Sequence, residues 1–338
     1  MAVRTMYLGA KLFQVLSQDS TAARGCAGWI DDLERKASTD SHSNLPVNDT
    51  ANYLMIRLEL SFLKFATVDT ASGYNLLRKA LPMFFQLVAT ETDLYKEHPN
   101  GNLVVSFLRT LNSTPHEFQR FVIYDTISAL ILGVPPLVEY GYDGGCDSSS
   151  YVFEWVHGIP LTLVEIVSQV NSWRAGSRVP LDDWKTMESR VLAWSPPPAV
   201  PGDDPAENVS VARSAVQESW RQVVLIYIYM GICGVSSHDS RVQASVHRIV
   251  QLGETVANLP IGIHVFAHCI VAGLAAKLEK HRVLIHKMLL SFTGTRAWLF
   301  RGPQFGEVLY HLWHGVGLGG GPVKWDDYVQ SRCAVMPI

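Results

Sequence analysis

The sequence predicts an all-α protein, an irregular array of antiparallel helices packed around one central apolar helix. Apolar residues recur at helical spacing from Asp49 onward, and the alternating pattern that is typical of strands is nearly absent. Of the 338 residues, 48% are hydrophobic and only 17% are charged, whereas about a quarter is the usual charged share. Many helix faces should therefore be buried. No repeat of fixed period is visible, which disfavours a regular solenoid.

The chain divides into four segments. Residues 1–48 should hold a short N-terminal helix and a polar connection rich in Ser, Asp, Asn and Thr. Residues 49–194 and 208–338 should be two helical parts of one domain. Between them, residues 195–207 read SPPPAVPGDDPAE, and the five prolines of this segment cannot continue a helix. We interpret it as a linker or loop.

Apolar spacing and prolines predict the helices of the first part. The expected helices begin at Asp49 and then cover 71–89, 102–111, 115–132 and about 160–174, with a further one between Pro180 and Pro196. Pro82 should kink the second of these helices or start it. The helix after Pro160 should bury a stripe formed by Leu163, Ile166, Val167, Val170 and Trp173.

The second part contains the predicted central helix, at about residues 216–228. One stripe on this helix consists of Val216, Trp220, Val223, Val224 and Tyr227. The opposite side is filled by Leu225, Ile226 and Ile228. Because apolar residues lie on both sides, this helix should be covered all round.

Further helices should follow to the C-terminus. Asp239 should cap the first of them, whose buried stripe would be Val242, Val246, Ile249, Val250 and Val256. Three more are expected at about 264–278, 281–292 and 303–314. In the segment WDDYVQSR, Asp326 and Asp327 should cap a short last helix, with Trp325 packed beside them.

Charge and cysteine usage exclude several classes of protein. The 28 basic and 31 acidic residues give a net charge of −3, which indicates no strong attraction to nucleic acid. The five cysteines are scattered and no pair is spaced C-x-x-C, which argues against a disulfide framework and against a thiolate zinc site. The longest apolar run, 223–235, is well short of the roughly 20 residues that a membrane helix needs. We expect a soluble, intracellular protein.

Two histidine pairs are candidate metal ligands. His264 and His268 lie four residues apart, but Val265 stands where a metalloprotease has its glutamate. His311 and His314 lie three residues apart and flank an apolar pair. Because no third ligand is indicated for either pair, we interpret all four as packed or surface histidines.

Two other motifs resemble functional motifs, but each lacks a residue or a structural context that the function requires. Asp31 and Asp32 are reminiscent of the aspartate clusters that hold magnesium in helical isoprenoid-type enzymes, yet Arg35 stands where a further acidic residue is needed. Glycines in the segment 315–320 match G-x-G-x-x-G, but they follow a helix instead of a strand, so we interpret them as a flexible loop. We therefore predict no catalytic, cofactor-binding, metal-binding or DNA-binding residue in this chain.

Ordered apolar and tryptophan patterns in five segments resemble a known family. The segments are FVIYDTISALILGVPPLVEY at 121–140, FEWVHGIPLTLVEIVSQVNSWR at 153–174, residues 220–243, WLFRGPQFGEVLYHLWHGVG at 298–317 and KWDDYVQSRCAVMPI at 324–338. Together they resemble the fungal-specific transcription factor domain, the helical regulatory region of fungal zinc binuclear cluster transcription factors. The resemblance extends from about residue 50 to the end.

This resemblance implies a regulatory, protein-interacting domain that controls transcription in the nucleus. Its implied partners are other proteins of the transcription machinery, a second copy of the chain, or a small-molecule effector. In the family, a six-cysteine cluster holds two zinc ions and contacts DNA, whereas Cys26 is the only cysteine before residue 146 here. We therefore expect no cofactor and no direct DNA binding by this chain. The alternative is an all-helical metal- or cofactor-dependent enzyme with a pocket between helices, which would need converging acidic or histidine side chains.

Overall fold

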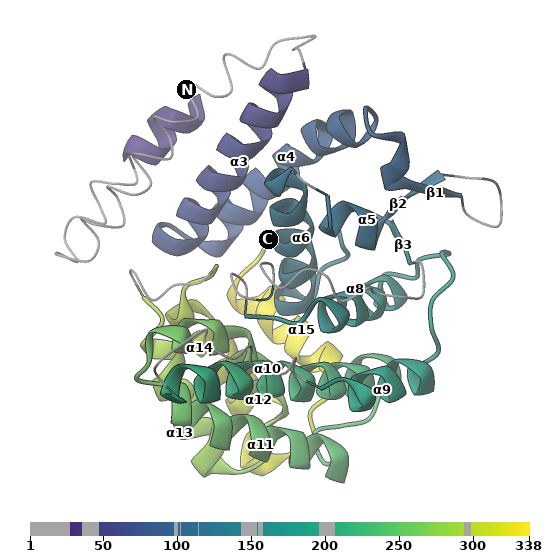
Figure 1. The fold of residues 1–338 in the computed structure, drawn as a ribbon. Coiled ribbons are helices and arrows are strands. Elements are labelled where there is room, and N and C mark those ends of the chain that lie inside the picture. The colour runs from purple at the N-terminus through teal and green to yellow at the C-terminus, as the bar shows by residue number, and fades with distance from the viewer. Residues whose placement is uncertain are drawn as a thin grey trace.

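The computed structural model describes residues 28–35, 47–97, 101, 103–113, 115–142, 154, 158–195, 207–293 and 299–338. Helices dominate these residues, which confirms the all-α prediction. The main helices are α3 (Val47–Thr67), α4 (Thr70–Val88), α6 (His116–Leu132), α8 (Leu161–Arg174), α9 (Trp184–Ala193), α10 (Glu207–Tyr227), α11 (Ser240–Val256), α12 (Phe266–Ala275), α13 (Glu279–Leu290), α14 (Gly302–His314) and α15 (Trp325–Val335). Figure 1 shows α10 to α14 gathered in the lower part of the molecule, below α3, α4 and α6.

The first two of these helices, α3 and α4, form an antiparallel hairpin. Asp69 caps α4 by accepting a hydrogen bond from the main-chain N–H of Ser72 at 2.7 Å. Gly73 permits close packing, because a Cβ atom there would lie 2.4 Å from the ring of Phe65. Pro82 lies inside α4 and does not start a helix.

A short helix at 28–35 packs against this hairpin, although the sequence predicts a polar connection there. Ile30 is fully buried in a small cluster that includes Leu63. The Nζ atom of Lys64 donates to a carboxylate oxygen of Glu34 at 2.6 Å. Apolar burial and this ion pair stabilise a helix in a segment that composition alone describes as a loop. The predicted N-terminal helix before residue 28 and nearly all of the proline-rich segment, residues 196–206, lie outside the described residues.

The prediction of a helix from residue 102 is wrong. A three-stranded sheet lies here, formed by β1 (Tyr95–Glu97), β2 (Leu103–Ser106) and β3 (Tyr140–Gly141), and the helix α5 (Phe107–Leu111) begins only after β2. In β2, Val105 is aligned with Tyr95 in an antiparallel pair and with Tyr140 in a parallel pair. Tyr140 is remote in sequence, and this tertiary pairing overrides the local helical pattern.

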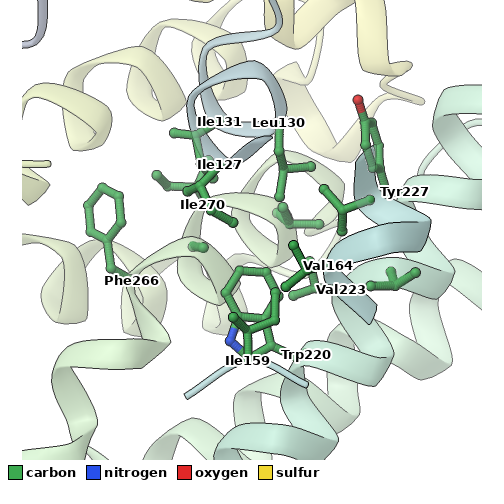
Figure 2. Packing of buried hydrophobic residues seen from close by; sticks show 14 of the residues in the cluster. Ile127, Leu130, Ile131, Ile159, Val164, Trp220, Val223, Tyr227, Phe266 and Ile270 are labelled. Carbon is green, nitrogen blue, oxygen red and sulfur yellow. The ribbon is translucent and has the colours of Figure 1, made fainter. Parts of the chain in front are cut away.

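The predicted central helix is the second half of α10, where residues 216–227 are buried or half-buried on every side. Trp220, Val223 and Tyr227 are at most 1% exposed. Figure 2 shows them among side chains of α6, α8 and α12, such as Ile131 and Phe266. One continuous cluster of buried residues reaches from α3 to α15, so the two predicted helical parts share a core.

Trp173 departs from the predicted stripe of α8. Leu163, Ile166, Val167 and Val170 are buried as predicted. Trp173 is 47% exposed, because it lies in the last turn of α8 and this end of the helix lies at the surface. The indole forms part of a pocket that is described below.

The glycine-rich break after α10 has a defined structure. Residues Ile228–Ile232 form a π-helix, η2, and Gly234 then takes a positive φ of 67° that a glycine adopts without strain. Asp239 caps α11 by accepting from the main-chain N–H of Arg241 at 2.9 Å, as predicted. A 3-10 helix, η3 (Pro260–Val265), precedes α12.

The last helix, α15, begins at Trp325, which is buried. Asp327 accepts from the main-chain N–H of Lys324 at 2.7 Å, so the prediction that Asp327 caps this helix is confirmed. The same prediction for Asp326 is wrong, because its carboxylate pairs with Arg174 of α8 at 2.6 Å. Among the described residues, no helix is both long and apolar enough to cross a membrane.

Candidate functional site

A surface groove between α13 and α14 is the first candidate site. It encloses about 480 Å³, and we call it the α13–α14 groove. Its lining residues are His286, Leu290, Pro303, Gly306, Glu307, Tyr310, His311, His314 and Gly315. Lining residues on α14 recur every three or four positions, so one face of this helix forms a wall of the groove.

Large apolar side chains of the groove are open to solvent. Leu290 is 49% exposed and Tyr310 is 56% exposed. The Tyr310 ring stacks on the ring of His314, with 3.8 Å between the centroids. The backbone of Gly306 is buried between the helices, where a Cβ atom would lie 3.5 Å from the His286 ring. The absence of a side chain at Gly306 thus keeps the hollow open.

Charged groups on the two helices are mixed in sign. On α13, Glu279, Lys280 and Lys287 are exposed but are not among the lining residues. On α14, Glu307 is exposed within the lining. The rest of the lining is largely apolar, so the surface can hold an apolar stripe.

The structure separates the two histidine pairs. His264 lies in η3 and is half-buried, and His268 lies in α12 and is buried, whereas His311 and His314 are exposed in the α13–α14 groove. The ring of His268 meets the Trp220 ring edge to face, with 4.6 Å between the centroids.

Burial sets the protonation states of His264 and His268. It lowers the pKa of His264 to about 4 and that of His268 to about 3, since an apolar environment disfavours the charged imidazolium. His264 and His268 are therefore neutral at physiological pH. In the part of the chain that the structure describes, no group of three or more His, Cys, Asp or Glu is arranged to hold a metal ion.

The other predicted motifs serve the fold. Asp31 accepts from the Nζ atom of Lys64 at 3.0 Å, and Asp32 pairs with Arg35, so these carboxylates take part in ion pairs on and beside the helix at 28–35. The glycine segment 315–320 follows α14 and contains a 3-10 turn, η5 (Leu318–Gly320). It does not link a strand to a helix, as a dinucleotide-binding turn would.

The groove was missed by the sequence analysis, and a partial signal existed. Tyr310 lies off the buried face of α14, which contains Leu309 and Leu312. A large aromatic residue on the outer face of a helix is only a weak signal, because a binding surface is marked by a contiguous apolar patch and not by one residue. The contribution of Leu290 depends on how α13 packs against α14, which the sequence does not reveal. Chemically, the groove can recognise apolar and aromatic groups.

The chain is similar to one known protein family. The sequence model of the fungal specific transcription factor domain matches residues 112–336. This match covers about two thirds of the chain and contains α10, α13, α14 and α15. No curated protein and no solved structure matches the chain.

Proposed function

Since the chain belongs to the fungal specific transcription factor domain family and is thus a regulator of transcription, we propose that it acts by binding another protein. In this proposal it controls transcription in the nucleus, catalyses no reaction and does not bind DNA by itself. The single observation that carries the proposal is the exposed apolar α13–α14 groove, which lies within the family match.

The shape and the apolar lining of the groove favour one kind of partner. Two neighbouring helices with a hollow between them can accept the apolar face of a third, amphipathic helix. Exposed Leu290 and Tyr310 would contact that face. We therefore propose an amphipathic helix of another transcription protein as the occupant.

Two further features support a role without DNA binding or catalysis. Acidic residues slightly outnumber basic ones, and the net charge is −3, whereas affinity for DNA comes largely from clustered cations. Two of the sequence candidates for chemistry serve the fold, because His268 is buried and Asp31 is engaged in an ion pair. In the described ranges, these observations do not favour the alternative of a metal- or cofactor-dependent enzyme.

Site-specific photo-crosslinking in cells tests this proposal. A photoreactive phenylalanine analogue is placed at Tyr310 and, in a matched control, at Val211, which is 67% exposed on α10 and outside the groove. The proposal predicts a protein adduct from position 310 that disappears when Leu290→Asp is added. Equal adducts from both positions, or an adduct at 310 that persists with Leu290→Asp, would contradict it.

A further inference from the structure

A second pocket lies at the junction of four elements, away from the α13–α14 groove. It encloses about 480 Å³ between the ends of α8 and η2 and the beginnings of α9 and α11. We call it the tryptophan pocket. Its lining residues are Trp173, Asp182, Asp183, Trp184, Ile232, Cys233 and Arg241.

Two indole rings in the lining are available to a ligand. Trp173 is 47% exposed and Trp184 is half-buried. Tryptophan has the most favourable ring face for a cation, because its π-system carries negative charge on the face. The Nζ atom of Lys185 already lies 5.7 Å from the centroid of the Trp184 ring. The protein itself thus places a cation near this ring.

The carboxylates of the pocket are held in position. Asp182 accepts from the Nη1 atom of Arg190 at 2.5 Å. Asp183 caps α9 by accepting from the main-chain N–H groups of Lys185 and Thr186 at 2.8 and 2.9 Å. The main-chain hydrogen bond from Thr186 is the largest cause that lowers the pKa of Asp183, so its carboxylate is ionised at neutral pH.

The positive charge of Arg241 is compensated within the pocket wall. Its guanidinium pairs with Asp239 at 2.9 Å and lies 4.3 Å from the centroid of the Tyr229 ring. The guanidinium of Arg190 pairs with Glu165 as well as with Asp182. Both arginines are therefore engaged with carboxylates, and the carboxylate of Asp183 lies exposed beside two aromatic faces.

We propose that the tryptophan pocket binds a small organic cation, with an alkylated ammonium group between the indole rings and the carboxylates. Cation–π attraction and the nearby negative charge favour such a group over a neutral one of the same shape. The idea that this ligand acts as an effector rests on the proposed regulatory function, but its binding does not.

The tryptophan pocket lies beside the continuation of the central helix, so a bound cation could affect the core. Ile232 ends the π-helix η2, which continues directly from the central helix α10. π-helical turns are rare, and those that occur are often found at functional sites. A ligand that contacts Ile232 and Trp184 therefore touches both α9 and the end of the central helix.

A titration followed by NMR tests the inference on the purified chain. The probe is choline, and the control is 3,3-dimethylbutan-1-ol, which has the same shape without the charge. We expect choline at millimolar concentrations to shift the indole N–H signals of Trp173 and Trp184, while the neutral alcohol has little effect. The inference is overturned if neither signal moves, or if the two compounds shift them equally.

Matched variants locate the binding. Trp173→Ala should weaken choline binding about tenfold, whereas Trp29→Ala, which removes another exposed tryptophan, should leave it unchanged. Asp183→Asn keeps the ability to cap α9 but removes the charge, and it should weaken binding severalfold. Unchanged affinity in both pocket variants would refute the site. Because this assay contains no partner protein, its failure would leave the α13–α14 groove proposal standing, and the reverse holds as well.

Discussion

The Nε atom of Arg332 lies 2.7 Å from the main-chain carbonyl oxygen of Leu132, which stands 200 residues earlier in the chain. The hydroxyl of Tyr328 likewise donates to the carbonyl oxygen of Ile131 at 2.5 Å. Carbonyl groups in the last turn of a helix lack partners within the helix. Here, side chains of α15 donate hydrogen bonds to the last carbonyl groups of α6. The next residue, Gly133, has a φ of +63° and a Cβ there would lie 2.5 Å from Val329. The end of the chain is therefore part of the core.

Arg332→Ala should destabilise the protein by about 2–3 kcal/mol, because it removes a buried charged donor and leaves the Leu132 carbonyl without this partner. Denaturation by urea, followed by circular dichroism, measures the loss. The matched control is Arg248→Ala, which removes an exposed arginine of α11 and should change the free energy of unfolding by less than about 0.5 kcal/mol. Equal effects of the two substitutions would refute the role of Arg332.

Trp220→Ala should cost about 3–5 kcal/mol of stability, as expected when a buried large aromatic residue is truncated. Trp220 is fully buried at the contact with His268. The comparison is Trp173→Ala, because Trp173 is 47% exposed and its truncation should cost far less. A denaturation midpoint that Trp220→Ala leaves unchanged would mean that α10 is not the centre of the core.

Stability should fall below about pH 6.5 because of His264 and His268. Their pKa values are about 4 and about 3 in the folded protein and about 6.5 in an unfolded chain. The unfolded chain therefore binds more protons as the pH falls below 6.5. The contribution is fully present above pH 6.5 and is lost as the pH falls, at up to about 1.4 kcal/mol per pH unit for each histidine.

His268→Phe should make this pH dependence of the free energy of unfolding less steep between pH 4 and pH 6.5, because only the contribution of His264 remains. The measurement compares the slope of the free energy of unfolding against pH, because the substitution also changes packing and therefore the absolute stability. As a control, His116→Phe alters an exposed histidine at the start of α6 and should keep the wild-type slope. If His268→Phe also keeps the wild-type slope, the assignment of His268 as buried and neutral is wrong.

A mobility-shift assay at physiological salt should detect only weak binding of DNA by residues 1–338. The net charge of −3 supplies little attraction to phosphate groups. Any binding should be independent of DNA sequence and should decrease steeply as salt is added. Sequence-specific binding at nanomolar concentrations would contradict the proposal that this chain needs another component to reach its target.

The sequence could predict the elements whose signals are local. The stripe of Trp220 and Tyr227 has helical spacing, and Asp239 is a strong cap directly before an amphipathic run, so both assignments are confirmed. The strand at Val105 could not be found in this way, because its pairing partner Tyr140 is remote in sequence. Trp173 has the spacing of a buried stripe, and only the packing around the end of α8 leaves it exposed.

The two pockets were even less accessible to prediction. Tyr310 and Leu290 meet only because α13 and α14 are neighbours, and four elements must converge before Trp173 and Asp183 line one hollow. A surface site depends on which helix faces remain uncovered after packing. Helical periodicity predicts the covered faces well, but it does not say which uncovered faces come together.

A reporter-gene measurement tests the central claim most directly, that the chain regulates transcription through the α13–α14 groove. Residues 1–338 are fused to an unrelated DNA-binding domain, and reporter transcription is measured in fungal cells for the wild type, Tyr310→Asp and Val211→Asp. The wild-type fusion should change transcription relative to the DNA-binding domain alone. Val211→Asp should match the wild type, while Tyr310→Asp should lose most of the effect at equal protein level and unchanged thermal stability. A full effect with Tyr310→Asp, or an equal loss with Val211→Asp, would contradict the claim.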